Sequence, residues 1–270
     1  MKSLALASVL AISASAFAAD NSSLNDLQYV PNAGTLFGSS QLSHQKYTVG
    51  EDNAFFQKIG YGITNNFFAE VGLEYSFTGN GDGYDALGDI VFNGRYRLME
   101  SSGNRFDLIG GVSISPEDAE SKGDKGNNFS GGHAVRVGAE YGNKTNERQW
   151  SFGAYYTHLL ESTTEYGGSD EDKDDAHGML SFGGNLLTRL GEHCFFKTFA
   201  AVNFIQKYDV ENDAFGDYEV SGTTVWNYGG EYQHFLNSDL YLNIGAQALR
   251  AGESESVTVM KYTAGANYQF

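Results

Sequence analysis

The stretch Phe67–Thr78, FFAEVGLEYSFT, alternates between apolar and mostly polar side chains. One set of alternate positions holds Phe67, Ala69, Val71, Leu73, Tyr75 and Phe77, and the other holds Phe68, Glu70, Gly72, Glu74 and Ser76. Successive side chains of a β-strand point to opposite faces. The stretch therefore predicts a strand with one apolar face and one polar face.

The same alternation recurs along most of the chain and predicts about twelve strands. Each is roughly ten residues long or a little longer, the length that a tilted strand needs to cross a bilayer. The candidates are Gly34–Val49, Ala54–Ile63, Phe67–Thr78, Leu87–Leu98, Arg105–Ser115, His133–Gly142, Arg148–Leu160, His177–Leu190, Phe195–Tyr208, Val220–Phe235, Asp239–Arg250 and Val257–Phe270. The pattern is least clear in the first two candidates and in Arg148–Leu160.

Composition supports an all-β chain. The 270 residues include 34 glycines and only 2 prolines, and aromatic residues make up 14%. Val, Phe, Tyr and Thr, which favour strands, are common. Cys194 is the single cysteine, so an intrachain disulfide is excluded. The formal charge of −17 argues against binding to nucleic acid through its phosphates.

The connections between the predicted strands alternate between short and long. The short turns are Thr64–Asn66, Glu100–Asn104, Asn143–Glu147, Gly191–Cys194 and Leu236–Ser238. The longer connections are Gly50–Asn53, Gly79–Ala86, Pro116–Gly132, Glu161–Ala176, Asp209–Glu219 and Ala251–Ser256. This rhythm is typical of an antiparallel up-and-down barrel whose two rims face different compartments.

A soluble barrel or sandwich would alternate as well, but its outer face would be rich in Lys and Glu. Here the polar face is mostly Gly, Asn, Ser, Gln and Thr, and aromatic residues gather toward strand ends. Examples are Tyr61, Phe77, Tyr96, Phe106, Trp150, Tyr262 and Phe270. Aromatic girdles mark membrane barrels. We therefore predict a closed antiparallel transmembrane β-barrel of about twelve strands over residues 34–270.

The N-terminal residues predict export. Residues 1–18 contain Lys2, an apolar run and a small-x-small cleavage pattern at Ala16–Ala18, as in a secretory signal peptide. The apolar run is too short to span a bilayer as a helix. Residues 19–33 are polar and non-periodic, and we expect them to form a short, loosely held periplasmic lead.

The alternation runs through the last ten residues, KYTAGANYQF, to Phe270. This ending resembles the C-terminal signature of Gram-negative outer-membrane proteins, whose final aromatic residue is read by the barrel-assembly machinery. The resemblance implies that Tyr268 and Phe270 are an assembly signal. It also implies a location in the outer membrane, in contact with lipid and lipopolysaccharide.

A second resemblance covers roughly Lys58 to His158. The segments KIGYGITNNFFAEVGLEY, ALGDIVFNGRYRLMESSGNRFDLIGGVSIS, GGHAVRVGAEYG and WSFGAYYTH carry it. They resemble outer-membrane proteins assigned to the meta-pathway of phenol degradation, which are regarded as porin-like channels or transporters for small, often apolar molecules. This likeness implies a channel for passive or facilitated passage of small solutes, and it transfers no substrate-binding residue.

The predicted inward faces carry charged side chains. Lipid-facing Arg or Lys at the bilayer midplane costs roughly 2–4 kcal/mol, so these groups are expected to line the barrel interior. They are Glu70, Glu74, Asp89, Arg95, Arg97, Asp107, Arg136, Glu140, Arg189, Glu231 and Lys261. Two interpretations stay open: internal ion pairs that hold the barrel shut, or a narrow polar pore whose fixed charges set selectivity.

Two other functions remain as alternatives. Asp175 and His177, with Asp82 and Asp85 on an earlier loop, faintly resemble the mouth of omptin proteases, and a phospholipase or lipid A deacylase is also considered. The loop Glu161–Ala176 holds seven carboxylates and one lysine. It could attract divalent cations or act as an adhesive surface, although a solvated acidic loop is the simpler interpretation. No catalytic residue, metal site or cofactor is predicted.

Overall fold

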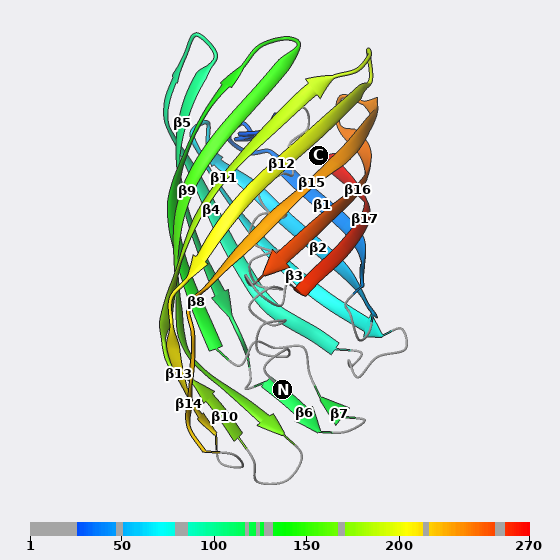
Figure 1. The fold of residues 1–270 in the computed structure, drawn as a ribbon. Coiled ribbons are helices and arrows are strands. Elements are labelled where there is room, and N and C mark those ends of the chain that lie inside the picture. The colour runs from blue at the N-terminus through cyan, green and yellow to red at the C-terminus, as the bar shows by residue number, and fades with distance from the viewer. Residues whose placement is uncertain are drawn as a thin grey trace.

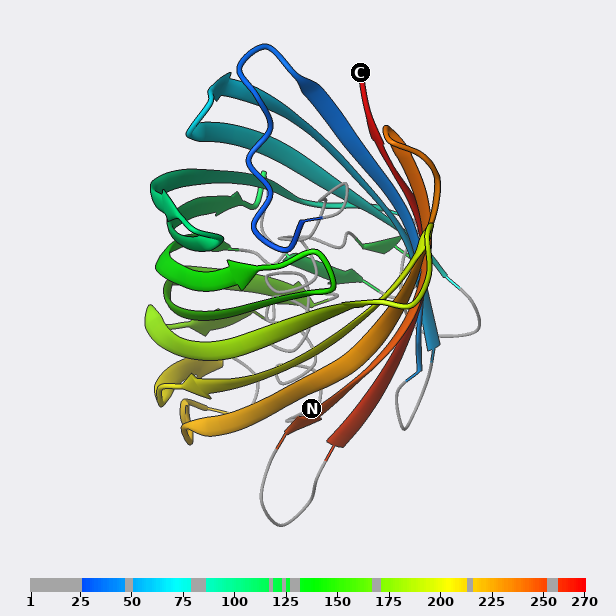
Figure 2. The same cartoon turned by 90° about the horizontal axis from the view of Figure 1, so that it is seen from above.

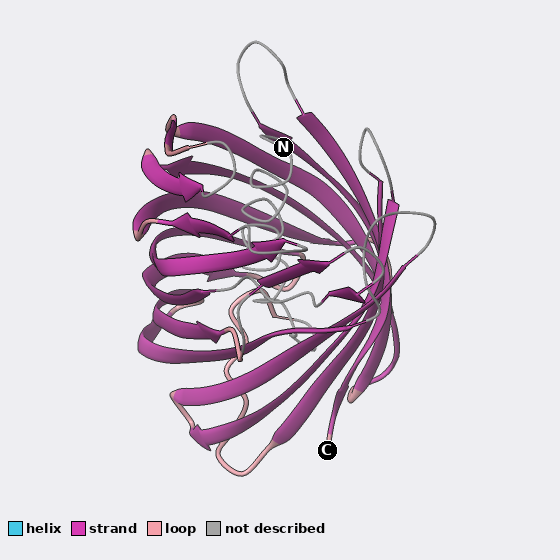
Figure 3. Ribbon diagram, turned by 90° about the horizontal axis from the view of Figure 1, so that it is seen from below, coloured by secondary structure: helices cyan, strands magenta, loops and turns pink. Residues whose placement is uncertain are grey.

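The computed structural model describes residues 26–46, 51–78, 86–116, 119–122, 125–126, 132–166, 171–212, 216–251 and 257–270. These residues form seventeen β-strands joined by loops (Figure 3). Among them there is no helix with the length and hydropathy needed to cross a membrane. The predicted signal peptide, residues 1–18, lies outside the described part of the chain, as do Asp82 and Asp85.

Twelve long strands form one closed antiparallel barrel (Figure 1). They are β1 Leu36–Lys46, β2 Glu51–Thr64, β3 Phe67–Thr78, β4 Ala86–Ser101, β5 Asn104–Ile114, β8 Gly132–Lys144, β9 Arg148–Tyr166, β11 His177–Arg189, β12 Cys194–Ile205, β15 Thr223–Asn237, β16 Leu240–Ala251 and β17 Val257–Gln269. The predicted all-β, up-and-down transmembrane barrel is confirmed as a fold.

Closure comes from pairing between the last strand and the first. β17 pairs with β1 in continuous register from Phe37↔Gln269 to Lys46↔Met260. β1 pairs with β2 on its other side, from Leu36↔Tyr61 to Lys46↔Glu51. The ring therefore has no open edge, which is the condition for a β-structure to survive in lipid.

The two rims of the barrel differ, as the loop rhythm predicted. Five short strands extend the long-loop rim, at the lower end of Figure 1. They are β6 Ala119–Lys122, β7 Lys125–Gly126, β10 Glu171–Asp174, β13 Tyr208–Asn212 and β14 Tyr218–Val220. The opposite rim has tight turns. Between β4 and β5, Ser102 and Gly103 have φ of 51° and 81°, the left-handed pair that a two-residue hairpin turn requires.

The segment before β1 differs from the prediction. Residues 26–33 were expected to be loosely held, but Asp26, Leu27, Gln28 and Pro31 are buried. Figure 2 shows this segment turning from β1 into the opening of the barrel at the short-turn rim. We call residues 26–35 the lead. It is held because its polar groups meet partners on the barrel wall.

Candidate functional site

The two faces of the barrel wall differ in chemistry. On the outward face, apolar side chains are exposed, such as Leu98 at 57% and Ile244 at 62%. The alternate positions point to the barrel interior, and there Arg95 and Glu140 are each only 3% exposed and Asp107 is 0% exposed. The interior is therefore the polar side of the wall, and it is the candidate functional site.

A buried network of ion pairs joins three neighbouring strands. Arg95 on β4 donates from Nη1 to Asp107 Oδ2 on β5 at 2.9 Å. Its Nη2 lies 2.9 Å from Glu140 Oε2 on β8. Arg97 donates from Nε to Asp107 Oδ1, also at 2.9 Å. Because Arg97, Asp107 and Glu140 are register neighbours across these strands, the network ties this wall together from the inside.

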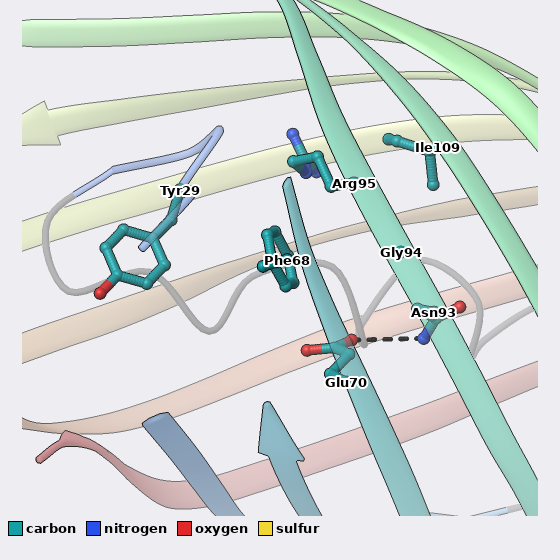
Figure 4. Close-up of a pocket in the computed structure, with 7 residues that line it drawn as sticks. All are labelled: Tyr29, Phe68, Glu70, Asn93, Gly94, Arg95 and Ile109. Carbon is teal, nitrogen blue, oxygen red and sulfur yellow. Dashed lines mark hydrogen bonds between the residues drawn. The ribbon is translucent and has the colours of Figure 1, made fainter. Parts of the chain in front are cut away.

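A second charged pair lies on the adjoining strands. Lys58 Nζ on β2 is 3.5 Å from Glu70 Oε1 on β3. Asn93 Nδ2 on β4 donates to the same oxygen at 3.2 Å. Figure 4 shows the pocket beside this pair, which is lined by Tyr29, Phe68, Glu70, Asn93, Gly94, Arg95 and Ile109. Tyr29 belongs to the lead, so the lead forms one side of this pocket.

Asp26 fastens the lead to the charged wall. Its carboxylate accepts a hydrogen bond from Arg105 Nη1 on β5 and another, at 3.1 Å, from Lys144 Nζ on β8. Burial acts to raise the pKa of Asp26, but the charges of Lys144 and Arg105 outweigh it and leave the pKa below its usual value. The Asp26 carboxylate is therefore held in its charged form.

The rest of the lead crosses the opening. Gln28 accepts from Arg97 Nη2 through its backbone oxygen and donates from Nε2 to the Glu140 carbonyl at 3.3 Å. Leu27 packs on the far wall in a buried apolar cluster with Leu187, Phe195, Phe235 and Tyr241. The Tyr29 hydroxyl donates to Gln269 on β17. These contacts reach strands on opposite sides, so the lead narrows the short-turn mouth.

The wall formed by β12, β15, β16 and β17 is rich in amides. Its inward side chains include Asn203, Asn227, Gln233, Asn243, Gln247 and Asn267, all buried. Glu231 accepts from Gln233 Nε2 at 2.7 Å and from Asn243 Nδ2 at 2.9 Å. Asn267 donates to Asn243 at 3.2 Å. Most polar groups of this wall are therefore neutral, although it also carries Glu231, Lys197 and Lys261, in contrast to the ion-paired wall of β2–β8.

The structure places most of the predicted interior charges on the inward face. Glu70, Arg95, Arg97, Asp107, Arg136, Glu140 and Lys261 are buried there, and Glu74, Asp89 and Glu231 are half-buried. Arg136 lies over the ring of Tyr155, 4.1 Å from its centroid. Arg189 departs from the prediction. It is exposed at the end of β11 and donates to the carbonyls of Gly191 and Glu192, because the strand has reached the rim.

Sequence reasoning missed Lys58, Lys197 and Arg105. The inward orientation of Lys58 was not recognised because the outward face of β2 carries Gln57 where an apolar residue was expected. Gln57 is satisfied on that face, since it accepts from Ser40 Oγ at 2.5 Å and donates to the Tyr268 hydroxyl at 2.8 Å. Matching the outward face to an apolar pattern therefore failed on the strand that bears Lys58.

Of the residues considered for the alternative hydrolase site, Asp175 and His177 are described by the structure, whereas Asp82 and Asp85 are not. His177 Nδ1 lies 2.9 Å from the backbone oxygen of Asp175, and its ring stacks on Tyr208 at 4.0 Å. Among the described residues, no cluster of three or more His, Cys, Asp or Glu side chains could hold a metal ion.

The single cysteine, Cys194, is half-buried, and its sulfur accepts a hydrogen bond from the Tyr232 hydroxyl at 2.9 Å.

The two predicted assembly residues lie at the seam between β17 and β1. The Phe270 backbone N–H donates to the Leu36 carbonyl at 2.8 Å, and Phe270 is 77% exposed. Tyr268 stacks edge-on against Phe270 with 5.3 Å between centroids. Its ring covers Gly38, where a Cβ would collide with it. Both aromatic rings therefore belong to the outward surface at the short-turn rim.

Comparison with known proteins identifies the fold. No protein-family model and no curated protein matches the chain. Among solved structures, the COG4313 outer membrane channel from Pseudomonas putida F1 matches with a TM-score of 0.65 and 10% identity, over 90% of this chain and 97% of that one.

Two porins are also similar. The NanC porin has a TM-score of 0.58 and 12% identity, over 85% of this chain and 98% of that one. The KdgM porin in complex with disordered oligogalacturonate has a TM-score of 0.54 and 9% identity, over 86% and 99%. At these identities the likeness shows that the chain has the fold of an outer-membrane barrel.

Proposed function

We propose that this protein is an outer-membrane channel that lets small solutes pass through the barrel interior, by passive or facilitated diffusion. One observation carries the proposal: a closed barrel with an apolar outward face and a polar, charge-bearing interior. Such a wall is suited to lipid on one side and to water and solutes on the other.

The position of the basic side chains supports a membrane-spanning role. Arg95, Arg97 and Arg136 point inward and are buried. The residues next to these arginines in sequence point outward and are exposed. They are Tyr96 and Leu98 on β4 and Val135 and Val137 on β8. A midplane arginine on the lipid face costs roughly 2–4 kcal/mol, so this arrangement suits a bilayer.

The cellular setting completes the proposal. The signal peptide predicted over residues 1–18 would export the chain, and the barrel-assembly machinery would insert it, with Tyr268 and Phe270 as the signal. The mature barrel would contact lipid and lipopolysaccharide, and its acidic outer loops could attract divalent cations. Fold likeness to the COG4313 channel and to porins supports this setting, as does the sequence resemblance to phenol-degradation outer-membrane proteins.

The lead would set the width of the path. It crosses the short-turn mouth through Asp26, Leu27 and Gln28, which contact both the charged wall and the apolar cluster opposite. A path for solutes would pass beside this segment. The proposal is therefore a narrow channel, in which the lead forms the constriction and the paired charges form one side.

The test is conductance of the purified, refolded barrel in a planar bilayer, together with swelling of liposomes loaded with a polymer and placed in small neutral solutes. We expect discrete single-channel currents and swelling that falls with solute size. A correctly folded barrel that shows neither would refute the channel. A loss of surface hydrolysis in His177→Ala, found with such a silent barrel, would favour the enzymatic alternative.

A further inference from the structure

Three inward amides on the wall of β12, β15, β16 and β17 have unmet hydrogen-bonding capacity. Asn203 on β12, Asn227 on β15 and Gln247 on β16 are 0%, 1% and 6% exposed. Asn203 Oδ1, both amide atoms of Asn227, and Gln247 Nε2 have no hydrogen-bond partner within the described part of the chain. Buried polar side chains are nearly always hydrogen-bonded, so a group of exceptions on one wall indicates a site.

The strand register brings the three amides together. Asn227 lies opposite Ala201 on β12, two residues from Asn203. On its other side Asn227 lies opposite Leu249 on β16, two residues from Gln247. The three amides therefore form a diagonal row in which each neighbouring pair is about 7–8 Å apart, so one small ligand can bridge Asn227 and either of its two neighbours. We call Asn203, Asn227 and Gln247 the amide patch.

Apolar side chains frame the amide patch toward the long-loop rim. Val225 lies opposite Asn203, and Leu249 lies opposite Asn227. Both belong to a buried cluster that also contains Ala134, Leu159, Met179, Ile205, Ala251 and Val259. A hydrogen bond beside such groups is strengthened by the low local dielectric. The patch therefore combines hydrogen-bonding groups with an apolar surface.

We propose that the amide patch is a binding subsite for a neutral, hydroxyl-bearing small solute with an apolar frame. A hydroxyl both donates and accepts, so it can meet an amide N–H and an amide oxygen. The frame of the solute packs on Val225 and Leu249. An ionised solute would lose hydration beside these apolar groups. The subsite rests on the proposed channel, because the solute reaches it through the barrel.

Lys261 offers the competing basis for selectivity. It lies opposite Gln247 in the β16–β17 register and is 5% exposed. If Lys261 determined the choice of solute, the wall would select anions. Two probes with the same ring separate these cases: trans-1,2-cyclohexanediol, which is neutral, and cyclohexanecarboxylate, which is an anion.

The experiment measures binding of each probe to the purified barrel in detergent by saturation-transfer NMR. The test variant combines Asn203→Leu, Asn227→Leu and Gln247→Met, which keep side-chain size and remove the amides. Asn185→Leu is the matched control, because Asn185 is an inward amide on β11 whose Nδ2 already donates to Ser151 Oγ at 3.2 Å. Heat-modifiable migration on a gel verifies that each variant is folded.

We expect the diol to bind to the wild type and to the control, and to bind about tenfold or more weakly to the triple variant, since several hydrogen bonds are lost. The carboxylate should bind more weakly than the diol. Undiminished diol binding in the folded triple variant, tighter binding of the carboxylate, or no diol binding to the wild type would each overturn the subsite. Equilibrium binding of the diol does not require that it pass through the barrel. A barrel that conducts ions but does not bind the diol would refute the subsite alone. A barrel that binds the diol but does not conduct would refute the channel.

Discussion

Replacing Asp107 with asparagine is a direct test of the interior ion-pair network. Asp107 is fully buried and accepts hydrogen bonds from Arg95 and from Arg97. Asp107→Asn keeps the shape of the side chain and removes its charge. The buried guanidinium groups of Arg95 and Arg97 would then both lose one negatively charged partner. This loss should destabilise the wall formed by β4, β5 and β8.

The structure bounds the size of this effect. Breaking a buried ion pair by removing one partner costs about 3–5 kcal/mol of unfolding free energy. Arg95 keeps Glu140 at 2.9 Å, and Arg97 keeps Glu100 at 3.0 Å, so neither arginine is left alone. We therefore expect a loss near the lower end, about 3 kcal/mol.

The assay is equilibrium unfolding in urea of barrels folded into lipid vesicles. Trp150 and Trp226 lie on the outward face, 43% and 55% exposed, so their fluorescence reports transfer from lipid to water. Glu219→Gln is the matched control, because it removes a carboxylate that pairs with Lys207 at 2.9 Å between two exposed side chains. Exposed pairs contribute little, so the control should match the wild type. An Asp107→Asn barrel that unfolds within about 1 kcal/mol of the wild type would refute the network as a structural element.

The remaining predictions concern the lead, the long-loop rim and the seam between β17 and β1. Asp26→Ala should release the lead from Arg105 and Lys144 and so raise the single-channel conductance. Asn32→Ala, at an exposed position of the lead, should leave the conductance unchanged. Equal conductance of the two variants would exclude the lead as the constriction. Burial and the neighbouring Asp172 raise the pKa of Asp174 on β10 to about 6, above the 3.8 of an unperturbed aspartate. Because the folded state binds this proton more tightly than the unfolded state, the folded form of β10 loses stability as the pH rises toward and past 6. Amide hydrogen exchange in β10, corrected for the intrinsic rate, should therefore be faster at pH 7.5 than at pH 5. The Asp174→Asn variant should lack this pH dependence. Phe270→Ala should lower the fraction of heat-modifiable barrel in outer-membrane preparations, and an unchanged fraction would exclude Phe270 as an assembly signal.

The fold was predictable because the alternation of apolar and polar residues has the same period as the strand. The predicted strand Phe67–Thr78 has the same bounds as β3. β9 was predicted to end at Leu160 but continues to Tyr166. Its extension is polar and pairs with β10 outside the apolar band, from Asp174↔Ser162 to Glu171↔Glu165. A strand that contacts neither lipid nor an apolar core does not need an apolar face, so hydrophobic alternation cannot detect it.

The partners of the interior charges were not predictable from alternation. Alternation tells which side chains face inward, but the stagger between strands decides which of them meet. Arg95, for example, lies opposite Phe68 on the preceding strand and forms its ion pair with Asp107 on the following strand. The register shift between Arg97 and Met99 is part of that stagger, and no local sequence signal specifies it.

That the lead is held against the barrel wall was not predictable for a related reason. Residues 19–33 are polar and non-periodic, which is also typical of a linker. What holds Asp26 in place is its match to Arg105 and Lys144, which are distant in sequence and meet only after β5 and β8 have paired. Long-range complementarity of this kind needs the closed barrel as its template.

The two walls of the interior impose different conditions on a passing solute. An ion that used Asp107 or Glu140 as a partner would have to compete with arginines already bound at 2.9 Å. Such competition opposes passage by roughly the free energy of the pair, about 3 kcal/mol for a buried one. Asn203 and Asn227 on the opposite wall have amide atoms without partners among the described residues, so a solute that hydrogen-bonds to them breaks no hydrogen bond among those residues. A neutral solute should therefore follow the wall of β12, β15 and β16, while the ion-paired wall mainly keeps the barrel closed and in register.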